Sequence, residues 1–441
     1  MQSSIKMEAS EVERLLRQNG DKIERLFDGK LEDSAREQKA LLRRREIQQA
    51  KDLLHLALVY ALQDWSLNLL GVWAFLVGIG YLSDVALLKR LRNCADWLGT
   101  LLYQVLQQRC AGLGQDPGVR ICLRDATVVN APGSAGTDWR IHLKLDLGKG
   151  CISDVAVTDR KTGENLTTLA IQPGEIEVAD RGYSLASGIG AVLEKFAHVV
   201  VRLNAQNLPL WLDAHTRLDL PGWLRQVTAP AEQPVCLKTP FGWFAMRVLA
   251  HPLDPQAAEE ARRRVRASAR KKKYQPSEAS LLAAGFILLI TDLAVEVWPM
   301  QRVFWLYRLR WQVELQFKSY KSLLQLDRLR AHNPQMARTY LLAKLLLVLL
   351  VEELTQEVRT QQPHWFSDPL RPVSVWRLTA CLKEYLHQVL VGSLSFARLW
   401  SCLPALQRYF RLSPRSRLNQ YAWAQAFLEH FSVSNAASFS C

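Results

Sequence analysis

The chain lacks the cysteine patterns that stabilise small secreted domains and structural zinc sites. Its eight cysteines include no Cys-x-x-Cys pair, and their spacing matches no zinc-ligand set. We therefore expect reduced thiols in a cytoplasmic protein. The polar, charged segment 1–45 contains no secretory signal peptide, which agrees with that expectation.

Long hydrophobic runs are also absent. The two most apolar segments, 67–82 and 341–351, contain Asn68 and Lys344, and both are shorter than the roughly 20 residues that a membrane-spanning helix requires. Both segments fit buried helices better, so we expect no membrane partner. Internal repeats and low-complexity tracts are missing too, which favours a globular protein of several domains.

Negative charge is in short supply. The 441 residues carry 56 Lys and Arg against 42 Asp and Glu, a net charge of +14. An excess of this size is typical of a protein that meets nucleic acid or an anionic membrane surface. A basic enzyme without such a partner is the alternative.

Residues 1–112 have helical composition and periodicity throughout. Ser10 stands three residues before Glu13, which predicts a capping box at the start of a helix over 11–18. Further helices are predicted over 31–52 and 53–65.

A helix-turn-helix-like segment follows within this region. The order is a short apolar helix, a turn with Gly78 and Gly80, and a second helix from Ser83 that ends in three cations, Lys89, Arg90 and Arg92. We therefore interpret 1–112 as a helical DNA-binding domain in which these three cations contact DNA. A two-helix hairpin packed into a bundle fits the same pattern.

The period changes to that of strands after residue 119. Alternating residues predict a strand over 119–123, and two more strands, 141–147 and 151–157 around the turn 148–150, complete an antiparallel meander. A short strand over 175–179, a helix and an apolar strand over 198–203 follow. Three antiparallel strands followed by parallel strands is the order of a ribonuclease-H-like fold. The fold class is thus α+β, with a ribonuclease-H-like core in two parts, 113–204 and 282–335.

The segment 205–281 interrupts that core. It holds Trp211, Trp223 and Trp243 among prolines and glycines, has two predicted strands, and ends in a basic arm with eight cations over 262–273. We interpret it as an inserted β-rich subdomain whose basic arm binds DNA without sequence preference. A merely solvated helix face is the alternative for the arm. Residues 336–441 are predicted to be a helical domain, with possible dimerisation.

A helix over 307–321 carries the most informative pattern. At about 100° per residue, four polar side chains fall within about 60° of one another beside an apolar stripe: Tyr307, Arg310, Glu314 and Lys321. One carboxylate among two cations and a phenol suits the wall of an active site for a polyanion. An ordinary amphipathic helix with a solvated charged face explains the same pattern.

Three acids stand where a ribonuclease-H-like fold can bring them together. Asp125 is predicted near the end of the first strand, Asp180 at the end of the fourth, and Glu314 on the late helix. Such carboxylates can hold two divalent cations that activate a water or hydroxyl. Taken singly, each acid is equally explained as a cap or turn former. Asp146 and Glu164 are further acids whose participation the sequence leaves open.

These motifs resemble those of a known family. The spacing Tyr307-x2-Arg310-x3-Glu314-x6-Lys321 is similar to the Y-R-E-K signature of DDE transposases of bacterial insertion sequences, specifically family four. Asp180-Arg181-Gly182-Tyr183 resembles the family's second-aspartate motif, and Arg124-Asp125-Ala126-Thr127 resembles the first. Ala126 departs from the usual Gly or Ser and leaves the metal ligand intact.

The resemblance implies a function and a set of roles. Asp125, Asp180 and Glu314 would be catalytic and bind two Mg²⁺ ions, for which Mn²⁺ can substitute. Tyr307, Arg310 and Lys321 would contact phosphates of the transposon end, and Arg181 and Tyr183 would hold DNA beside the second acid. The partners would be double-stranded DNA, as transposon ends and target, and a second copy in a synaptic homodimer.

The implied reaction is cut-and-paste transposition by way of a hairpin at the element's end. One tryptophan of the insert would stack on a flipped base, and the sequence does not choose among the three. A ribonuclease-H-like nuclease without strand transfer is one alternative. A catalytically inactive DNA-binding remnant is the other.

Overall fold

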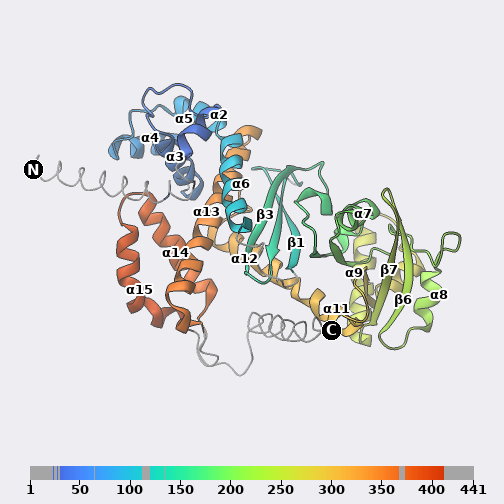
Figure 1. Cartoon of the computed structure of the whole chain (residues 1–441). Coiled ribbons are helices and arrows are strands. Elements are labelled where there is room, and N and C mark those ends of the chain that lie inside the picture. Colours follow the sequence, from blue (N-terminus) through green and yellow to red (C-terminus); the bar gives the residue numbers. More distant parts are fainter. Residues whose placement is uncertain are drawn as a thin grey trace, which may run out of the picture.

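One eight-stranded sheet runs through the molecule. The computed structural model describes residues 23, 27, 30–63, 65–111, 120–134, 136–366 and 373–411. In Figure 1 the first and last helices of the described chain gather at one end of the molecule, and strands β6 and β7 lie at the other. The strand order is β3-β2-β1-β4-β5-β8-β7-β6.

The first five strands have the predicted order. They are β1 (Arg120–Val129), β2 (Trp139–Asp146), β3 (Cys151–Asp159), β4 (Glu175–Ala179) and β5 (His198–Arg202). β1, β2 and β3 form an antiparallel meander, and β4 runs parallel to both β1 and β5. The predicted helix between β4 and β5 is α7 (Ala186–Glu194). The meander and the parallel strands are therefore confirmed.

The strands of the predicted insert extend this same sheet. β6 (Ala231–Thr239) and β7 (Gly242–Pro252) form a hairpin, and β8 (Phe286–Thr291) joins β7 to β5, both in antiparallel pairing. Three helices accompany them: α8 (Leu220–Gln226), α9 (Pro255–Lys271) and α10 (Glu278–Ala283). The predicted strands are thus present, but they continue the core sheet.

The two faces of the sheet are covered by different helices. Leu123 of β1 and Val178 of β4 share a core with α11 (Met300–Leu309), α12 (Trp311–Leu324) and α13 (Pro334–Gln361). The residues of β5 that face the other way pack with α7 in a second core. Because successive side chains of a strand point to opposite faces, neighbouring residues of β1 enter different environments.

The helices before the sheet differ from the prediction at one place. They are α2 (Leu31–Glu37), α3 (Ala50–Leu62), α4 (Leu67–Leu76), α5 (Asp84–Arg92) and α6 (Ala95–Ala111). The predicted continuous helix over 31–52 is wrong, because α2 ends at Glu37. Lys39 has a φ of +58°, and the Ala40 N–H donates to the Ala35 carbonyl at 2.9 Å, a left-handed helix end that periodicity does not reveal. The helix predicted over 11–18 lies outside the described residues.

The helix-turn-helix-like pair is formed by α4 and α5. The turn between them contains Gly78 and Gly80 with φ of +81° and +150°, which explains the glycines. The Ser83 hydroxyl accepts a hydrogen bond from the Ala86 N–H at 3.2 Å, so the predicted cap is confirmed.

The C-terminal helices complete the helical end of the molecule. α13 has 28 residues, is buried along most of its length, and packs against α3, α6 and α14 (Val375–Leu390). α15 (Phe396–Phe410) packs on α14. In the part of the chain that the structure describes, no helix combines the length and apolarity needed to cross a membrane.

Candidate active site

Asp125 and Asp180 are brought together by the parallel pairing of β1 and β4. The register aligns Leu123 with Val178, and each aspartate stands two residues further along its strand direction. Both side chains therefore point to the face of the sheet that α11 and α12 cover. Asp180 follows β4 directly, as predicted. Asp125 lies in the middle of β1, because β1 continues to Val129 in pairing with β2, and its predicted place near the strand end is corrected.

Local backbone groups hold each aspartate in place. The Gly182 N–H donates to Asp180 Oδ1 at 2.8 Å, and the Ala126 N–H donates to Asp125 Oδ1 at 2.9 Å. Neither aspartate forms an ion pair with any described residue. The two aspartates therefore collect negative charge that no ion pair with a described residue neutralises.

The pKa of Asp125 reflects its burial first and the neighbouring charges second. Burial raises its pKa to about 7, and the carboxylates of Asp180 and Glu314 push it in the same direction. The Ala126 hydrogen bond and the Arg310 guanidinium oppose the rise. The three predicted acids are thus electrostatic neighbours, although Asp125 and Glu314 lie far apart in the chain. A bound cation would offset the cost of ionising Asp125.

Glu314 reaches this site from the first turn of α12. α11 packs on β4 and β5, while α12 packs on β1 and β2, so the helical segment crosses the strands that carry the aspartates. The predicted single helix over 307–321 is corrected to two helices, which meet at Arg310. The Arg310 and Val313 N–H groups each bond three residues back, at 3.1 Å, which tightens the chain at the junction.

Arg310 holds the Glu314 carboxylate. Its Nη2 lies 2.5 Å from Glu314 Oε1, and the Glu314 side chain is 31% exposed. Among the described residues, no three His, Cys, Asp or Glu side chains lie close enough together to form a ready-made site for one metal ion. The carboxylate oxygens nevertheless suit hard divalent cations. In this conformation Glu314 is engaged by Arg310, so a complete ligand set requires its side chain to turn.

Comparison with known proteins assigns the family. A model of the transposase DDE domain matches residues 117–350, which include all three acids. The chain belongs to the DDE transposase family. It is 38% identical over 335 residues to the putative transposase InsL of insertion sequence element IS186A from Escherichia coli (strain K12), covering 74% of this chain and 90% of the relative. The identity to the transposase of element IS421 from Escherichia coli is also 38%, with the same coverage.

A more distant relative is also a transposase of an insertion sequence. The transposase of element IS231F from Bacillus thuringiensis subsp. israelensis is 30% identical over 268 residues, 52% of this chain and 55% of the relative. The chain is therefore an enzyme, a DDE transposase of the kind found in bacterial insertion sequences, and DNA is its partner. Domains of this kind generally use divalent metal ions.

Three of the predicted DNA-contact residues of the transposase, Tyr307, Arg310 and Lys321, lie on α11, at its junction with α12, and on α12. Tyr307 is half-buried, and the Arg310 guanidinium carbon lies 5.6 Å from the centre of its ring. Burial raises the pKa of Tyr307, while Arg310 and Arg202 oppose that rise. Lys321 is half-buried in the last turn of α12 and forms no ion pair with a described residue.

The second-aspartate motif contributes one exposed cation and one buried ring. Arg181 is exposed, and its Nη2 donates to Asn204 Oδ1 at 3.4 Å. Tyr183 is only 2% exposed and packs in the second core with α7. Its burial contradicts the predicted DNA contact, because the ring has no free surface to offer. The apolar body of Tyr183 instead supports the turn that follows Asp180.

The three cations of α5 lie in the helical end of the transposase, apart from the acids (Figure 1). Lys89 is exposed, whereas Arg90 donates to the Arg43 carbonyl at 2.5 Å. The Arg92 Nε is buried without a hydrogen-bond partner among the described residues. Of the three, Lys89 is the side chain best placed to meet a ligand in this conformation.

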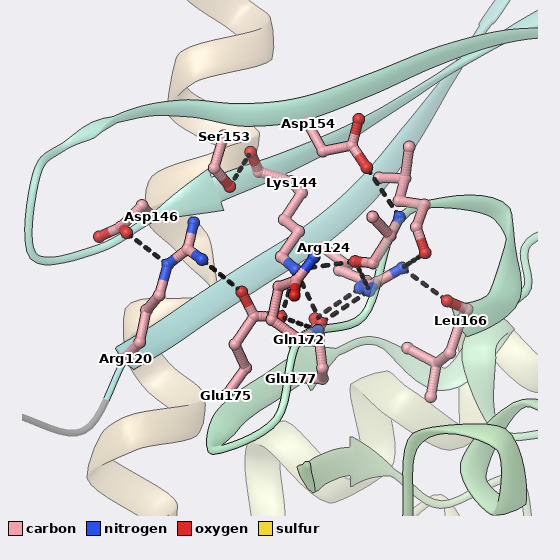
Figure 2. Close-up of polar contacts among 12 residues, drawn as sticks. Arg120, Arg124, Lys144, Asp146, Ser153, Asp154, Leu166, Gln172, Glu175 and Glu177 are labelled. Atoms are coloured by element: carbon pink, nitrogen blue, oxygen red, sulfur yellow. Dashed lines mark hydrogen bonds and ion pairs between the residues drawn. The ribbon is translucent and has the colours of Figure 1, made fainter. Parts of the chain in front are cut away.

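A buried ionic network, not predicted from the sequence, lies on the opposite face of the same strands (Figure 2). Arg124 pairs with Glu177 at 2.5 Å, and Lys144 bridges Glu175 and Glu177 at 2.5 and 3.1 Å. Arg120 joins Glu175 to Asp146 at 2.6 and 2.9 Å. The signal was present in the sequence as charged residues at alternate positions of otherwise apolar strands. Asp146 belongs to this network and is therefore not a metal ligand in this conformation.

Proposed function

We propose that this transposase cuts and joins DNA at the ends of an insertion sequence, with Asp125, Asp180 and Glu314 as its catalytic carboxylates. The observation that carries the proposal is the convergence of these acids from β1, β4 and α12, with the pKa of Asp125 raised to about 7. Two Mg²⁺ ions, or Mn²⁺, bound by these residues would activate the attacking hydroxyl and stabilise the leaving oxygen.

Arg310 acts first as a holder of Glu314 and then as a phosphate ligand. Its guanidinium now pairs with Glu314 and lies over the Tyr307 ring. A guanidinium has five N–H donors in a fork that matches phosphate oxygens. A phosphate that reaches Arg310 competes with Glu314 for these donors and frees its carboxylate to turn toward Asp125 and Asp180. Lys321, two helical turns beyond Glu314, contacts a second phosphate, and the exposed Arg181 contacts the strand beside Asp180.

A basic surface on α9 supplies affinity without sequence preference. Arg262 and Arg266 pair with Glu259, and Arg264 pairs with Glu260. The cations toward the end of the helix and just beyond it are exposed and form no ion pair with a described residue: Arg270, Lys271, Lys272 and Lys273. This end of α9 is the part that contacts phosphates.

Trp243 is the tryptophan of the insert best suited to stack on an unpaired base. It lies at the β6–β7 hairpin, is 42% exposed, and has Trp211 packed edge-on at 5.6 Å between ring centres. Trp211 and Trp223 are half-buried. Lys238 Nζ stands 5.6 Å from the Trp243 ring centre, ready to neutralise a nearby phosphate. This arrangement supports the hairpin route, in which a base must leave the helical stack.

The helical ends and the insert have separate roles in assembling the complex with DNA. The helical region 1–112 recognises the transposon end through α5, the insert and core bind it near the acids, and the C-terminal helices pair two copies in the synaptic complex. The five segments predicted from the sequence serve as the domains of this scheme.

The test uses a labelled duplex that carries the transposon end. The wild-type protein with Mg²⁺ should nick it, and the freed 3′-hydroxyl should attack the opposite strand to close a hairpin. Water should then open the hairpin, and the 3′-hydroxyl that this restores should join to target DNA. Lys321→Ala should slow cleavage or weaken end binding without lowering the unfolding temperature. Nicking without joined products would replace transposition with nuclease activity alone. An active Asp125→Asn or Asp180→Asn variant would remove that residue from the site.

A further inference from the structure

We infer that Glu164 is a fourth carboxylate of this active site and supplies an oxygen to the divalent cation held by Asp180. The inference rests on the proposed function, since it needs a metal at Asp180. Glu164 lies in the connection between β3 and β4, a segment to which the proposed function gives no part. Its side chain is half-buried.

The position of Glu164 is given by its contact with Gly182. A methyl group on Gly182 would fall 1.9 Å from Glu164 Oε2 and 3.2 Å from Asp180 Oδ1. The two carboxylates therefore approach the same point beside the Gly182 backbone. With Glu164 in this position, only a glycine leaves the space open. The glycine after Arg181 is therefore needed because the Glu164 carboxylate comes so close, and not because of its backbone dihedrals.

Glu164 also differs from the acids near it in sequence, because its carboxylate has no hydrogen-bond or ion-pair partner among the described residues. The other acids described between Asp125 and Asp180 each accept a hydrogen bond or an ion pair: Asp138, Asp146, Asp154, Asp159, Glu175 and Glu177. Glu164 accepts neither from any described residue. Arg140, a cation that acts on Glu164 electrostatically, donates an N–H to the Thr162 carbonyl at 2.5 Å instead of pairing with it.

An acid placed against another acid is unfavourable unless a cation binds there, and Arg140, which favours the charged form of Glu164, forms no ion pair with it. A structural carboxylate in a half-buried position normally has a partner, because an unpaired charge is costly to remove from water. Asp180 and Glu164 present hard oxygen donors near the same point beside Gly182. Mg²⁺ and Mn²⁺ prefer such oxygens and fill the rest of their coordination shell with water or phosphate.

The test measures metal binding directly. Mn²⁺ is titrated into the full-length protein bound to a transposon-end duplex, and free Mn²⁺ is followed by electron paramagnetic resonance. We expect Glu164→Gln to weaken Mn²⁺ binding about 10-fold or more and to raise the Mg²⁺ concentration for half-maximal cleavage by a similar factor. Glu194→Gln removes one charge from an exposed site on α7 and should match the wild type.

The outcomes separate the inference from the proposed function. If Asp180→Asn weakens Mn²⁺ binding and Glu164→Gln does not, Glu164 is no ligand and the inference is overturned while the site stands. If neither variant changes Mn²⁺ binding, the metal site lies elsewhere and the proposed function fails with it.

Gly182→Ala provides a second test that does not remove the carboxylate. The added methyl should push Glu164 away and weaken Mn²⁺ binding as much as Glu164→Gln does. In a Glu164→Ala background only the 3.2 Å contact with Asp180 Oδ1 remains, so Gly182→Ala should weaken binding much less than it does in the wild type. Effects that simply add would refute a shared contact, and thermal unfolding of each variant checks that it is folded.

Discussion

The two faces of strands β1 and β4 use charge in opposite ways. On one face three cations and three anions pair into a buried network, with Arg124 and Glu177 each no more than 1% exposed. On the other face Asp125 and Asp180 meet Glu314 with one arginine between them. Arg124 and Asp125 are neighbours in sequence and belong to different faces because strand side chains alternate. Neutralised charge stabilises the sheet, and excess negative charge is left where a cation is needed.

Removing an acid from the active face should have the largest effect. Asp125→Asn, Asp180→Asn and Glu314→Gln should each lower the cleavage rate roughly 10³-fold, because a metal ligand is worth several kcal/mol in the transition state. Binding of the transposon end should persist, which a gel-shift assay measures. A variant that neither binds nor folds would say nothing about catalysis, so circular dichroism is the control.

Breaking the network on the opposite face should act on stability instead. Arg124→Met leaves the Glu177 carboxylate without its closest partner and should lower the free energy of unfolding by about 3–5 kcal/mol. Arg124→Met combined with Glu177→Gln should recover much of that stability, since both charges are gone. Urea unfolding of the single and double variants measures both effects. An Arg124→Met protein as stable as the wild type would contradict the structural role of this face.

The unpaired acid Asp125 should make the stability of the protein depend on pH. Burial raises the pKa of Asp125 from 3.8 to about 7, so the folded protein holds a proton there that the unfolded chain loses. The stability that this proton contributes is present below about pH 4 and is lost as the pH rises to about 7. Without divalent metal, the wild type should therefore lose stability relative to Asp125→Asn over this range. Urea unfolding at several pH values measures it, and a constant difference would refute the raised pKa.

The smallest expected effect is on DNA binding, when cations that have an ion-pair partner on α9 are compared with cations at its end that have none. Replacing Lys271, Lys272 and Lys273 with Ala should weaken DNA binding and reduce the slope of log affinity against log salt by about 0.9 for each phosphate that is no longer neutralised. Arg262→Ala and Arg266→Ala should change the slope less, because Glu259 already pairs with both. Fluorescence anisotropy over a salt series compares the two sets of variants. Equal slopes for the two sets of variants would contradict the prediction that the unpaired cations contact more phosphates than the paired ones.

Much of the fold followed from local patterns. Alternation predicted β1, an apolar run predicted β5, and the Ser83 cap and the glycine turn predicted the pair α4 and α5. The helix end after Glu37 was missed because Lys39 adopts a left-handed conformation without being Gly or Asn. The junction at Arg310 was missed because its dihedrals remain helical and only its hydrogen-bonding pattern tightens.

The sequence by itself determined the residue types of the site: two aspartates after apolar runs, and a glutamate in helical register with Tyr307, Arg310 and Lys321. Spacing along the chain is enough for that, because helical or strand geometry fixes which residues share a face, and the tightened junction at Arg310 divides the helix in the structure. Only the tertiary structure decided which acids lack partners, that Tyr183 is buried, and that Glu164 and Asp180 approach each other beside Gly182. Those facts depend on contacts between residues distant in the chain, which no local period records.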